Sequence, residues 1–336
     1  MRDSVKFLDA LAAGYAGCGC DGPDDGLVLA VSGGADSMSL LHATCQLWPE
    51  RKEQMVVAHV NHQLRGSRST ADAEFVGEIT ETLGLELVTL TCDVRRLKET
   101  SGGSVEEVAR RSRYQLLQDT ALSKGFGSVV CAHHQDDQAE TVLHNIIRGT
   151  GLRGVAGMSL ARPMCEGVLL IRPMLKFNRR TIEAFLLCQQ LAWCVDESNA
   201  SDEFTRNRIR RHLMPLLAKD YNPQVVSSLT RLASHARDVE EQVRQAAQRC
   251  VDDVVLELQP DICRLDRTRL ALWPASVVRA SLRLIWDHQS WPQQDMTQTH
   301  WTDLTSSLRN TDQKPDACPG VELSVSSTVV RIFRSK

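Results

Sequence analysis

The sequence of 336 residues lacks any apolar run approaching the roughly 20 residues that a membrane-spanning helix needs. It also lacks low-complexity tracts, and its first residues do not show the basic-then-apolar pattern of a secretion signal. These absences predict a globular protein of the cytoplasm without a membrane partner. They do not indicate an oligomeric state.

No Cys-x-x-Cys pair occurs among the eleven cysteines, which are scattered and often lie in apolar runs. Such cysteines are typical of buried thiols in a reducing compartment. The nearest approach to a metal-binding pair is Cys18-Gly19-Cys20, which lacks the two-residue spacer of common zinc and iron–sulfur sites. The sequence therefore disfavours a metal–thiolate site.

An excess of positive charge is also missing, because the formal net charge is −3 and the isoelectric point is about 6.4. A bound nucleic acid would therefore depend on local basic patches rather than on a generally basic domain. Electrostatic attraction decays within about 8 Å at physiological salt, so such patches act locally.

Short apolar runs alternate with amphipathic stretches from Leu27 to about Gln190. The runs are apolar throughout, which is typical of strands buried on both faces. Strands joined by crossover helices predict a parallel-sheet, Rossmann-like α/β domain. The expected strands cover residues 27–31, 55–60, 87–90, 129–132 and 168–171, and the expected helices cover residues 36–47, 70–83, 104–123, 136–147 and 179–190.

The pattern changes near Asn222-Pro223, a plausible turn or helix start. We therefore expect two domains, an α/β domain over residues 1–218 and a smaller, mainly helical domain over residues 219–336. In the second domain, helices are expected over residues 225–255, 274–288 and 297–308, and strands over residues 321–325 and 328–333.

Ligands of parallel sheets bind beyond the carboxyl ends of the strands, which here singles out the loops after Val31, Val60 and Ala132. The first loop is Ser32-Gly-Gly-Ala-Asp-Ser37, and its glycines let backbone N–H groups turn toward a phosphate. The next helix adds its positive N-terminal end. The loop has no lysine to grip β- and γ-phosphates. A tight turn with a capping residue is the alternative interpretation.

The loop after Ala132 continues as His133-His-Gln-Asp-Asp-Gln-Ala-Glu140. On a helix that begins near Gln135, Asp136 and Glu140 are four residues apart, and Asp137 and Glu140 are three apart. Clustered carboxylates can bind Mg²⁺ beside phosphates, or hold an amine. Helix capping is the alternative, but it explains only one aspartate.

Two stretches carry basic residues within the expected first domain. The stretch His59 to Arg65 ends the second strand and could contact a nucleotide or an RNA phosphate, although a merely polar loop fits nearly as well. In the stretch Glu106 to Tyr114, Arg110 and Arg113 share a helix face. Taken alone, this second stretch is more simply interpreted as a solvated charged face.

The densest basic run is Arg206-Asn-Arg-Ile-Arg-Arg-His-Leu213. Asp202 and Glu203 lie three or four residues from Arg206 only, so the other arginines have no local acidic partner. Because guanidinium groups bind phosphates with two hydrogen bonds, the run favours phosphate binding. The glycine-rich stretch Arg148 to Gly157 is a weaker signal, either a helix stop or a mobile loop.

Together these motifs resemble the tRNA(Ile)-lysidine synthases, a family of N-type ATP pyrophosphatases with a PP-loop. The loop Ser32 to Ser37 is shared by the whole superfamily. The resemblance to this family rests on residues 59–65, 106–114 and 132–141, and is extended by residues 148–152, 193–199 and 206–210. The motifs run in order over about residues 27–217, whereas the last third is only loosely similar.

The resemblance implies a two-step reaction that uses ATP and Mg²⁺. ATP would adenylate O2 of the wobble cytidine in the CAU anticodon of a tRNA(Ile) precursor, with pyrophosphate leaving. The ε-amine of L-lysine would then attack C2, and AMP would leave. Residues 219–336 would bind the tRNA.

The resemblance also assigns roles to individual residues. The expected catalytic residues are Asp36, Asp137, Glu140 and Arg113. The residues expected to bind ATP are Ser32, Gly33, Gly34, Ala35, Asp36, Ser37, His59 and His133. Those expected to bind substrate or tRNA are Arg65, Arg148, Arg206 and Arg208, and those expected to hold Mg²⁺ are Asp36, Asp136 and Asp137.

Three alternatives remain open at this point. A tRNA-thiolating PP-loop enzyme activates a base in the same way, but it relies on reactive cysteines or paired cysteine motifs. An amide-forming ligase for a small molecule and a catalytically silent ATP- or RNA-binding module are the others.

Overall fold

The computed structural model describes residues 2–61, 67–101, 104–194, 204–293, 296–310 and 319–334. The chain divides into two compact units, Met1–Ser234 and His235–Lys336. This division falls within the long helix α11 (Val225–Val254), later than the expected boundary at residue 218. The first turns of α11 and the helix before it, α10 (Met214–Asp220), pack against the first unit through Val226, Leu229 and Met214.

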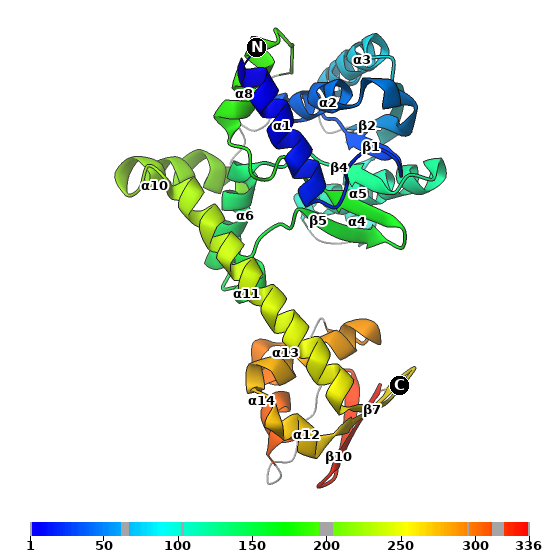
Figure 1. Ribbon diagram of the computed structural model, residues 1–336, viewed down its shortest axis with the longest axis vertical. Helices are drawn as coiled ribbons and strands as arrows, with labels where there is room; N and C mark the ends of the chain where they lie inside the picture. Colours follow the sequence, from blue (N-terminus) through cyan, green and yellow to red (C-terminus); the bar gives the residue numbers. More distant parts are fainter. Residues whose placement is uncertain are drawn as a thin grey trace. The chain divides into compact units, whose positions relative to one another are not determined.

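The first unit is built around a six-stranded sheet with the order β3-β2-β1-β4-β6-β5 (Figure 1). All neighbouring strands are parallel except β5, which is antiparallel to β6. The strands are β1 (Leu27–Ala30), β2 (Met55–Asn61), β3 (Glu86–Thr91), β4 (Ser128–Val130), β5 (Ala161–Cys165) and β6 (Val168–Ile171). The five parallel strands confirm the expected fold class. The edge strand β5 was not expected, because Arg162 and Pro163 are exposed and interrupt any apolar pattern.

Helices cover both faces of this sheet (Figure 1). Leu27 and Leu29 of β1 face a core with α1, α2 and α8, whereas Val28 faces a second core with Leu117 and Ala121 of α5. Burial on both faces explains why the strand residues are apolar without alternation. The helices are α1 (Arg2–Gly17), α2 (Ala35–Leu47), η1 (Pro49–Gln54), α3 (Ser67–Thr82), α4 (Val94–Ser101), α5 (Val105–Lys124), α6 (Gln135–Ile147), α7 (Leu152–Val155), α8 (Arg179–Cys188), α9 (Thr205–Arg208) and η3 (Ile209–Leu213).

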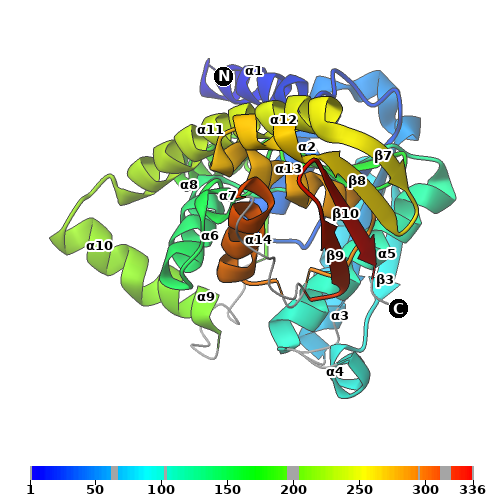
Figure 2. The same cartoon turned by 90° about the horizontal axis from the view of Figure 1, so that it is seen from below.

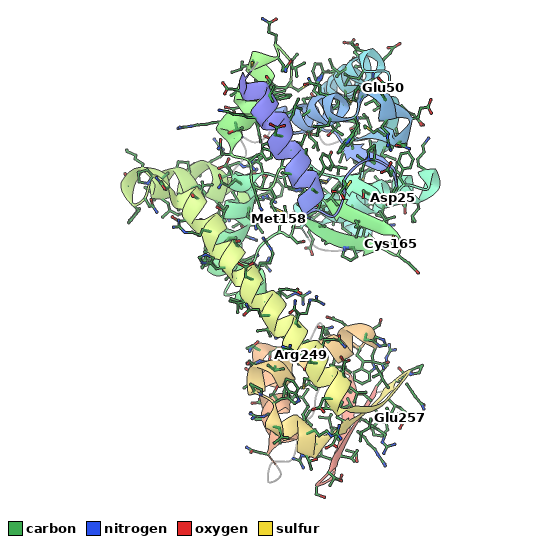
Figure 3. All side chains as sticks on the ribbon, viewed as in Figure 1. Asp25, Glu50, Met158, Cys165, Arg249 and Glu257 are labelled. Atoms are coloured by element: carbon green, nitrogen blue, oxygen red, sulfur yellow. The ribbon has the colours of Figure 1, made fainter. Side chains whose placement is uncertain are left out.

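Buried hydrogen bonds hold α6 against the rest of the first unit. The side chain of Gln138 is buried; its Nε2 donates to the carbonyl of Met158 at 3.1 Å, and its Oε1 accepts from the Met158 amide at 2.8 Å. Met158 is labelled in Figure 3. The amide of Gln135 donates to the carbonyl of Phe177. These contacts fix the first turn of α6, which carries the acidic residues.

The second unit contains an antiparallel sheet with the order β7-β8-β10-β9, and its helices lie against one face (Figure 2). Cys263, Leu265, Val330 and Ile332 point from this face into a core that contains Trp286 and further tryptophans. The elements are β7 (Val255–Gln259), β8 (Ile262–Asp266), α12 (Arg267–Leu272), α13 (Ala275–His288), α14 (Gln298–Arg309), β9 (Val321–Val325) and β10 (Val329–Arg334). The hairpin β7–β8 was not expected. Within the described ranges, no helix is long and apolar enough to span a membrane.

Arg267 ties the second unit together, and none of the described carboxylates pairs with it. Its guanidinium group is buried and donates to the carbonyls of Ser307, Leu308 and Asn310 near the end of α14. A fourth bond reaches the carbonyl of Ser326 in the β9–β10 turn. These bonds satisfy carbonyl groups that a helix end leaves unpaired.

Candidate functional site

The loop Ser32–Ser37 joins β1 to α2 and is shaped by its own hydroxyl groups. The hydroxyl of Ser37 accepts from the Ser32 amide at 3.1 Å and donates to the Gly34 carbonyl at 3.0 Å. Gly33 has a φ of +90°, and an added Cβ would lie 3.4 Å from Cγ2 of Val76. Gly34 caps α2 without a side chain, so the first amides of the helix remain directed at the space beyond the loop. This geometry suits a bound phosphate.

A cavity of about 500 Å³ adjoins this loop, a size typical of small-molecule sites. Residues from the loops after β1, β2 and β4 all contribute to its walls. The lining includes Ser32, Gly34, Asp36, Ser37, His59, Asn61, Asp72, Arg113, Cys131, His133, Asp137, Cys194 and Arg210. The cavity therefore connects the glycine-rich loop to the start of α6.

Two histidines of the cavity wall carry ring nitrogens that can form hydrogen bonds. Nδ1 of His59 lies 2.9 Å from the carbonyl of Val31, so this nitrogen donates a hydrogen bond to it. Nδ1 of His133 is buried and has no partner among the residues that the structure describes. Burial lowers the pKa of His133; the charge of Asp137 opposes this, and the charges of Arg172 and Arg113 add to the lowering. His133 is therefore a neutral ring with a free acceptor or donor.

His134 lies between three carboxylates and is almost fully buried, with 1% of its surface exposed. Its Nε2 is 3.5 Å from Asp36 Oδ2 and 3.5 Å from Asp137 Oδ2, and its Nδ1 is 3.4 Å from Asp136 Oδ2. Burial lowers the pKa of His134, but the hydrogen bonds to Asp136 and Asp36 and the charge of Asp137 outweigh it and raise the pKa to about 10. A proton on this ring is therefore favoured by the three carboxylates, and the neutral ring accepts at Nδ1 from the Asp136 amide at 3.2 Å.

Asp137 and Glu140 also pair with two arginines of the segment that follows residue 204, and we call these four residues the arginine–carboxylate cluster. Arg210 donates to Glu140 at 2.6 Å and to Asp137 at 2.8 Å. Arg206 makes the same two contacts at 3.3 and 3.4 Å. Burial raises the pKa of Asp137, but the charges of His134, Arg206 and Arg210 prevail and hold it below its usual range. The cluster has no net charge.

Asp36 offers the best position for a magnesium ion. Its Oδ1 is buried and has no hydrogen-bond partner within the described part of the chain, and it adjoins the glycine-rich loop. No group of three His, Cys, Asp or Glu side chains among the described residues is arranged to hold a metal by itself. Mg²⁺ commonly binds one or two carboxylates together with phosphates and water, so Asp36 fits such an ion beside a bound nucleotide.

The remaining sequence-based candidates lie in different places. Arg113 lines the cavity, and its Nε is buried without a partner among the described residues. Arg208 is exposed and donates to Thr205. Arg148 caps the far end of α6, away from the cavity. Arg65 lies outside the described residues.

Sequence reasoning missed several residues of the site. Arg210, His134 and Cys194 lie in stretches that the sequence analysis names but received no role there, and Asp72 was not considered. The spacing of four between Arg206 and Arg210, set against the spacing of three between Asp137 and Glu140, was the available signal. The amide of Cys194 donates to the Gly33 carbonyl at 2.9 Å, a contact that no local pattern predicts.

Comparison with known proteins gives consistent matches. Residues 12–217 match the PP-loop domain family. A tRNA(Ile)-lysidine synthase of Rhodopirellula baltica is 32% identical over 338 residues, covering 91% of this chain and 84% of that protein. The corresponding protein of Geobacter sulfurreducens is 40% identical over 251 residues, covering 74% of this chain and 52% of that protein. The chain spans about half the length of most of the curated relatives it matches.

A solved structure shares the fold at low sequence identity. The U34-tRNA thiolase NcsA of Methanococcus maripaludis, with its 4Fe–4S cluster, superposes with a TM-score of 0.56 at 18% identity. The match covers 69% of this chain and 78% of that one. At this identity the likeness supports the architecture of the sheet and its helices alone.

Proposed function

Because the chain belongs to the tRNA(Ile)-lysidine synthase family of PP-loop proteins, we propose that it ligates L-lysine to C2 of the wobble cytidine of a tRNA(Ile) precursor with a CAU anticodon. The observation that carries the proposal is one cavity that joins the glycine-rich loop to the arginine–carboxylate cluster. Such a cavity would hold an activated base between a phosphate site and an amine site.

In the first step, O2 of the cytidine attacks the α-phosphorus of ATP and pyrophosphate leaves. Ser32, Gly34 and the first amides of α2 would hold the pyrophosphate portion. Asp36 would hold Mg²⁺, which supplies positive charge to the phosphate oxygens when bound. The loop has no lysine for the γ-phosphate, which suits a reaction at the α-phosphorus.

In the second step, the ε-ammonium group of lysine loses a proton to solvent and the resulting amine attacks C2. The C2–O2 bond breaks, AMP leaves with the oxygen, and the new C2–N bond is completed by loss of a second proton to solvent. An ammonium group entering the arginine–carboxylate cluster would displace one guanidinium from Asp137 or Glu140. The released arginine could then take the carboxylate of the same lysine, so that no charge is left unpaired. His133 offers a free Nδ1 to the amine.

The last third of the chain would contact the tRNA. Its composition is nearly neutral, so this contact would depend on local basic patches of the second unit. A tRNA-thiolating activity is the alternative function.

The test is mass spectrometry of a tRNA(Ile) transcript incubated with the protein, ATP, Mg²⁺ and lysine. The expected result is a mass gain equal to lysine minus water on the wobble cytidine, with release of pyrophosphate. Asp36→Asn should abolish the gain, whereas Asp238→Asn, a change in the second unit, should leave it unchanged. A mass gain that matches exchange of oxygen for sulfur would contradict the proposal.

A further inference from the structure

Three arginines surround one tyrosine beside the cavity. The guanidinium carbons of Arg110, Arg113 and Arg162 lie 5.5, 5.4 and 5.2 Å from the ring centroid of Tyr114. Arg110, Arg113 and Tyr114 belong to α5, whereas Arg162 belongs to the edge strand β5, which ends at Cys165 (Figure 3). We call these four residues the Tyr114 cluster. Its members come from separate parts of the chain, so the fold itself concentrates the charge.

The charge of this cluster is not neutralised within the described residues. None of its three arginines has a carboxylate within ion-pairing distance among the described side chains. Because all three lie within 5.5 Å of one centroid, no two are farther apart than twice that distance, and they repel one another. The ring attracts each cation, but it carries no charge that would cancel theirs.

A fourth arginine, Arg172, adds to the same local field. Arg110, Arg113, Arg162 and Arg172 all act on the buried thiol of Cys131, whose pKa burial raises and these charges lower. Only 2% of Arg172 is exposed, and one of its nitrogens donates to the Ser159 carbonyl at 2.9 Å. Four positive charges thus converge behind one wall of the cavity, since Cys131 and Arg113 both line it.

Polar atoms in the cluster are left without partners. The hydroxyl of Tyr114 and the Nε of Arg113 and Arg172 are buried and form no hydrogen bond with the described residues. A buried hydroxyl or guanidinium N–H without a partner is costly, and proteins rarely leave several together. Exposed Arg110 and Arg162 keep one side of the cluster open to a ligand.

We propose that the Tyr114 cluster binds a backbone phosphate of the RNA next to the base that enters the cavity. This inference rests on the proposed function and names the surface that receives the RNA strand. A phosphodiester supplies one negative charge and several acceptor oxygens, which match converging guanidinium groups and the Tyr114 hydroxyl. The phosphates of ATP have a site at the glycine-rich loop. The phosphates of the RNA strand have no other site among the described residues, so we assign them to this cluster. Residues around the loop would then hold the nucleotide, and the Tyr114 cluster would hold the neighbouring phosphate.

The test measures binding of a fluorescently labelled anticodon stem-loop RNA to the full chain without ATP, at several salt concentrations. Arg110→Gln and Arg162→Gln should each weaken RNA binding roughly tenfold and reduce the salt dependence by about one released counterion. Tyr114→Phe, which removes only the hydroxyl, should weaken it several-fold. Arg111→Gln is the matched control, because Arg111 is an exposed neighbour on α5 outside the cluster.

Three further outcomes separate the possible errors. If Arg110→Gln and Arg162→Gln raised the KM for ATP and left RNA binding unchanged, the phosphate would belong to the nucleotide and the inference would be wrong. The inference would also fail if these variants matched Arg111→Gln in RNA binding. If lysine incorporation failed in the unmodified protein while the RNA binding results held, the proposed function would fall and the phosphate site would stand.

Discussion

Two groups of arginines flank the same cavity, and they differ in what neutralises them. In the arginine–carboxylate cluster, Arg206 and Arg210 each contact both Asp137 and Glu140. In the Tyr114 cluster, Arg110, Arg113 and Arg162 share one aromatic ring and have no carboxylate partner among the described residues. The arginines of the first group are paired with carboxylates of the protein. Those of the Tyr114 cluster carry positive charge that a bound ligand would neutralise.

The local sequence predicts the opposite assignment, with phosphate binding at the run after Arg206 rather than at the arginines around Tyr114. The run after Arg206 appeared suited to phosphates, because its arginines lack acidic neighbours at a spacing of three or four. Its partners instead come from α6, far along the chain. The stretch Glu106 to Tyr114 was more simply interpreted as a solvated face, yet its arginines converge with one from β5. Helical spacing describes neighbours on one helix and says nothing about charges that the fold brings from elsewhere.

The largest expected effect comes from breaking the paired group. Only 4% of the Glu140 side chain is exposed, and both of its oxygens accept from an arginine. Glu140→Gln should destabilise the first unit by roughly 3 kcal/mol, because two partly buried guanidinium groups lose a counter-charge. Lysine incorporation should fall by roughly 100-fold, the equivalent of about 3 kcal/mol in the barrier. Hydrogen exchange of α6 in urea and single-turnover kinetics measure the two effects.

A double variant checks the cause of that instability. Glu140→Gln combined with Arg210→Met removes the unpaired charge together with its partner, so most of the lost stability should return while activity stays low. Equal instability of the single and double variants would show that pairing is not what holds this region.

The fold could largely be predicted from the sequence, because its signals are local. Apolar runs such as Leu27 to Val31 and Val168 to Ile171 mark strands that are buried on both faces. Strand β5 and the hairpin β7–β8 gave no comparable signal, since β5 is an exposed edge and the end of α11 runs directly into β7. Tertiary pairing, rather than propensity, decides such segments.

The candidate site could be predicted less completely. The loop Ser32–Ser37 and the acidic turn of α6 are contiguous in sequence, and the cavity touches both. His134 shows what was out of reach: its pKa depends on Asp36, which is nearly 100 residues away in sequence. The spacing of residues within one segment does not predict a contact between Asp36, which follows β1, and His134, which follows β4.

An effect of intermediate size on stability is expected from a change in pH. It concerns the arginine–carboxylate cluster, because His134 contacts Asp137. The folded-state pKa of His134 is raised from 6.5 to about 10, so its contribution is fully present below pH 6.5 and is lost as the pH rises through about 10. The free energy of unfolding of the first unit should therefore fall progressively as the pH rises between these two values. Urea unfolding without Mg²⁺ across this range measures it. His134→Gln should flatten the dependence, and an unchanged slope in that variant would assign it to other groups.

The smallest expected effect on stability comes from removing one positive charge from the Tyr114 cluster. Arg162→Gln should leave the stability of the first unit unchanged or raise it by up to about 0.5 kcal/mol, because it relieves repulsion with Arg110 and Arg113 and breaks no ion pair with a described residue. The gain should shrink at high salt, where exposed charges are screened. Arg206→Gln is the matched comparison, since the same change in the arginine–carboxylate cluster leaves Asp137 and Glu140 with one arginine partner instead of two and should destabilise. Thermal unfolding of both variants at low and high salt measures the contrast. If Arg162→Gln destabilised the protein as much as Arg206→Gln, the Tyr114 cluster would be a structural element and not a charge held ready for a ligand.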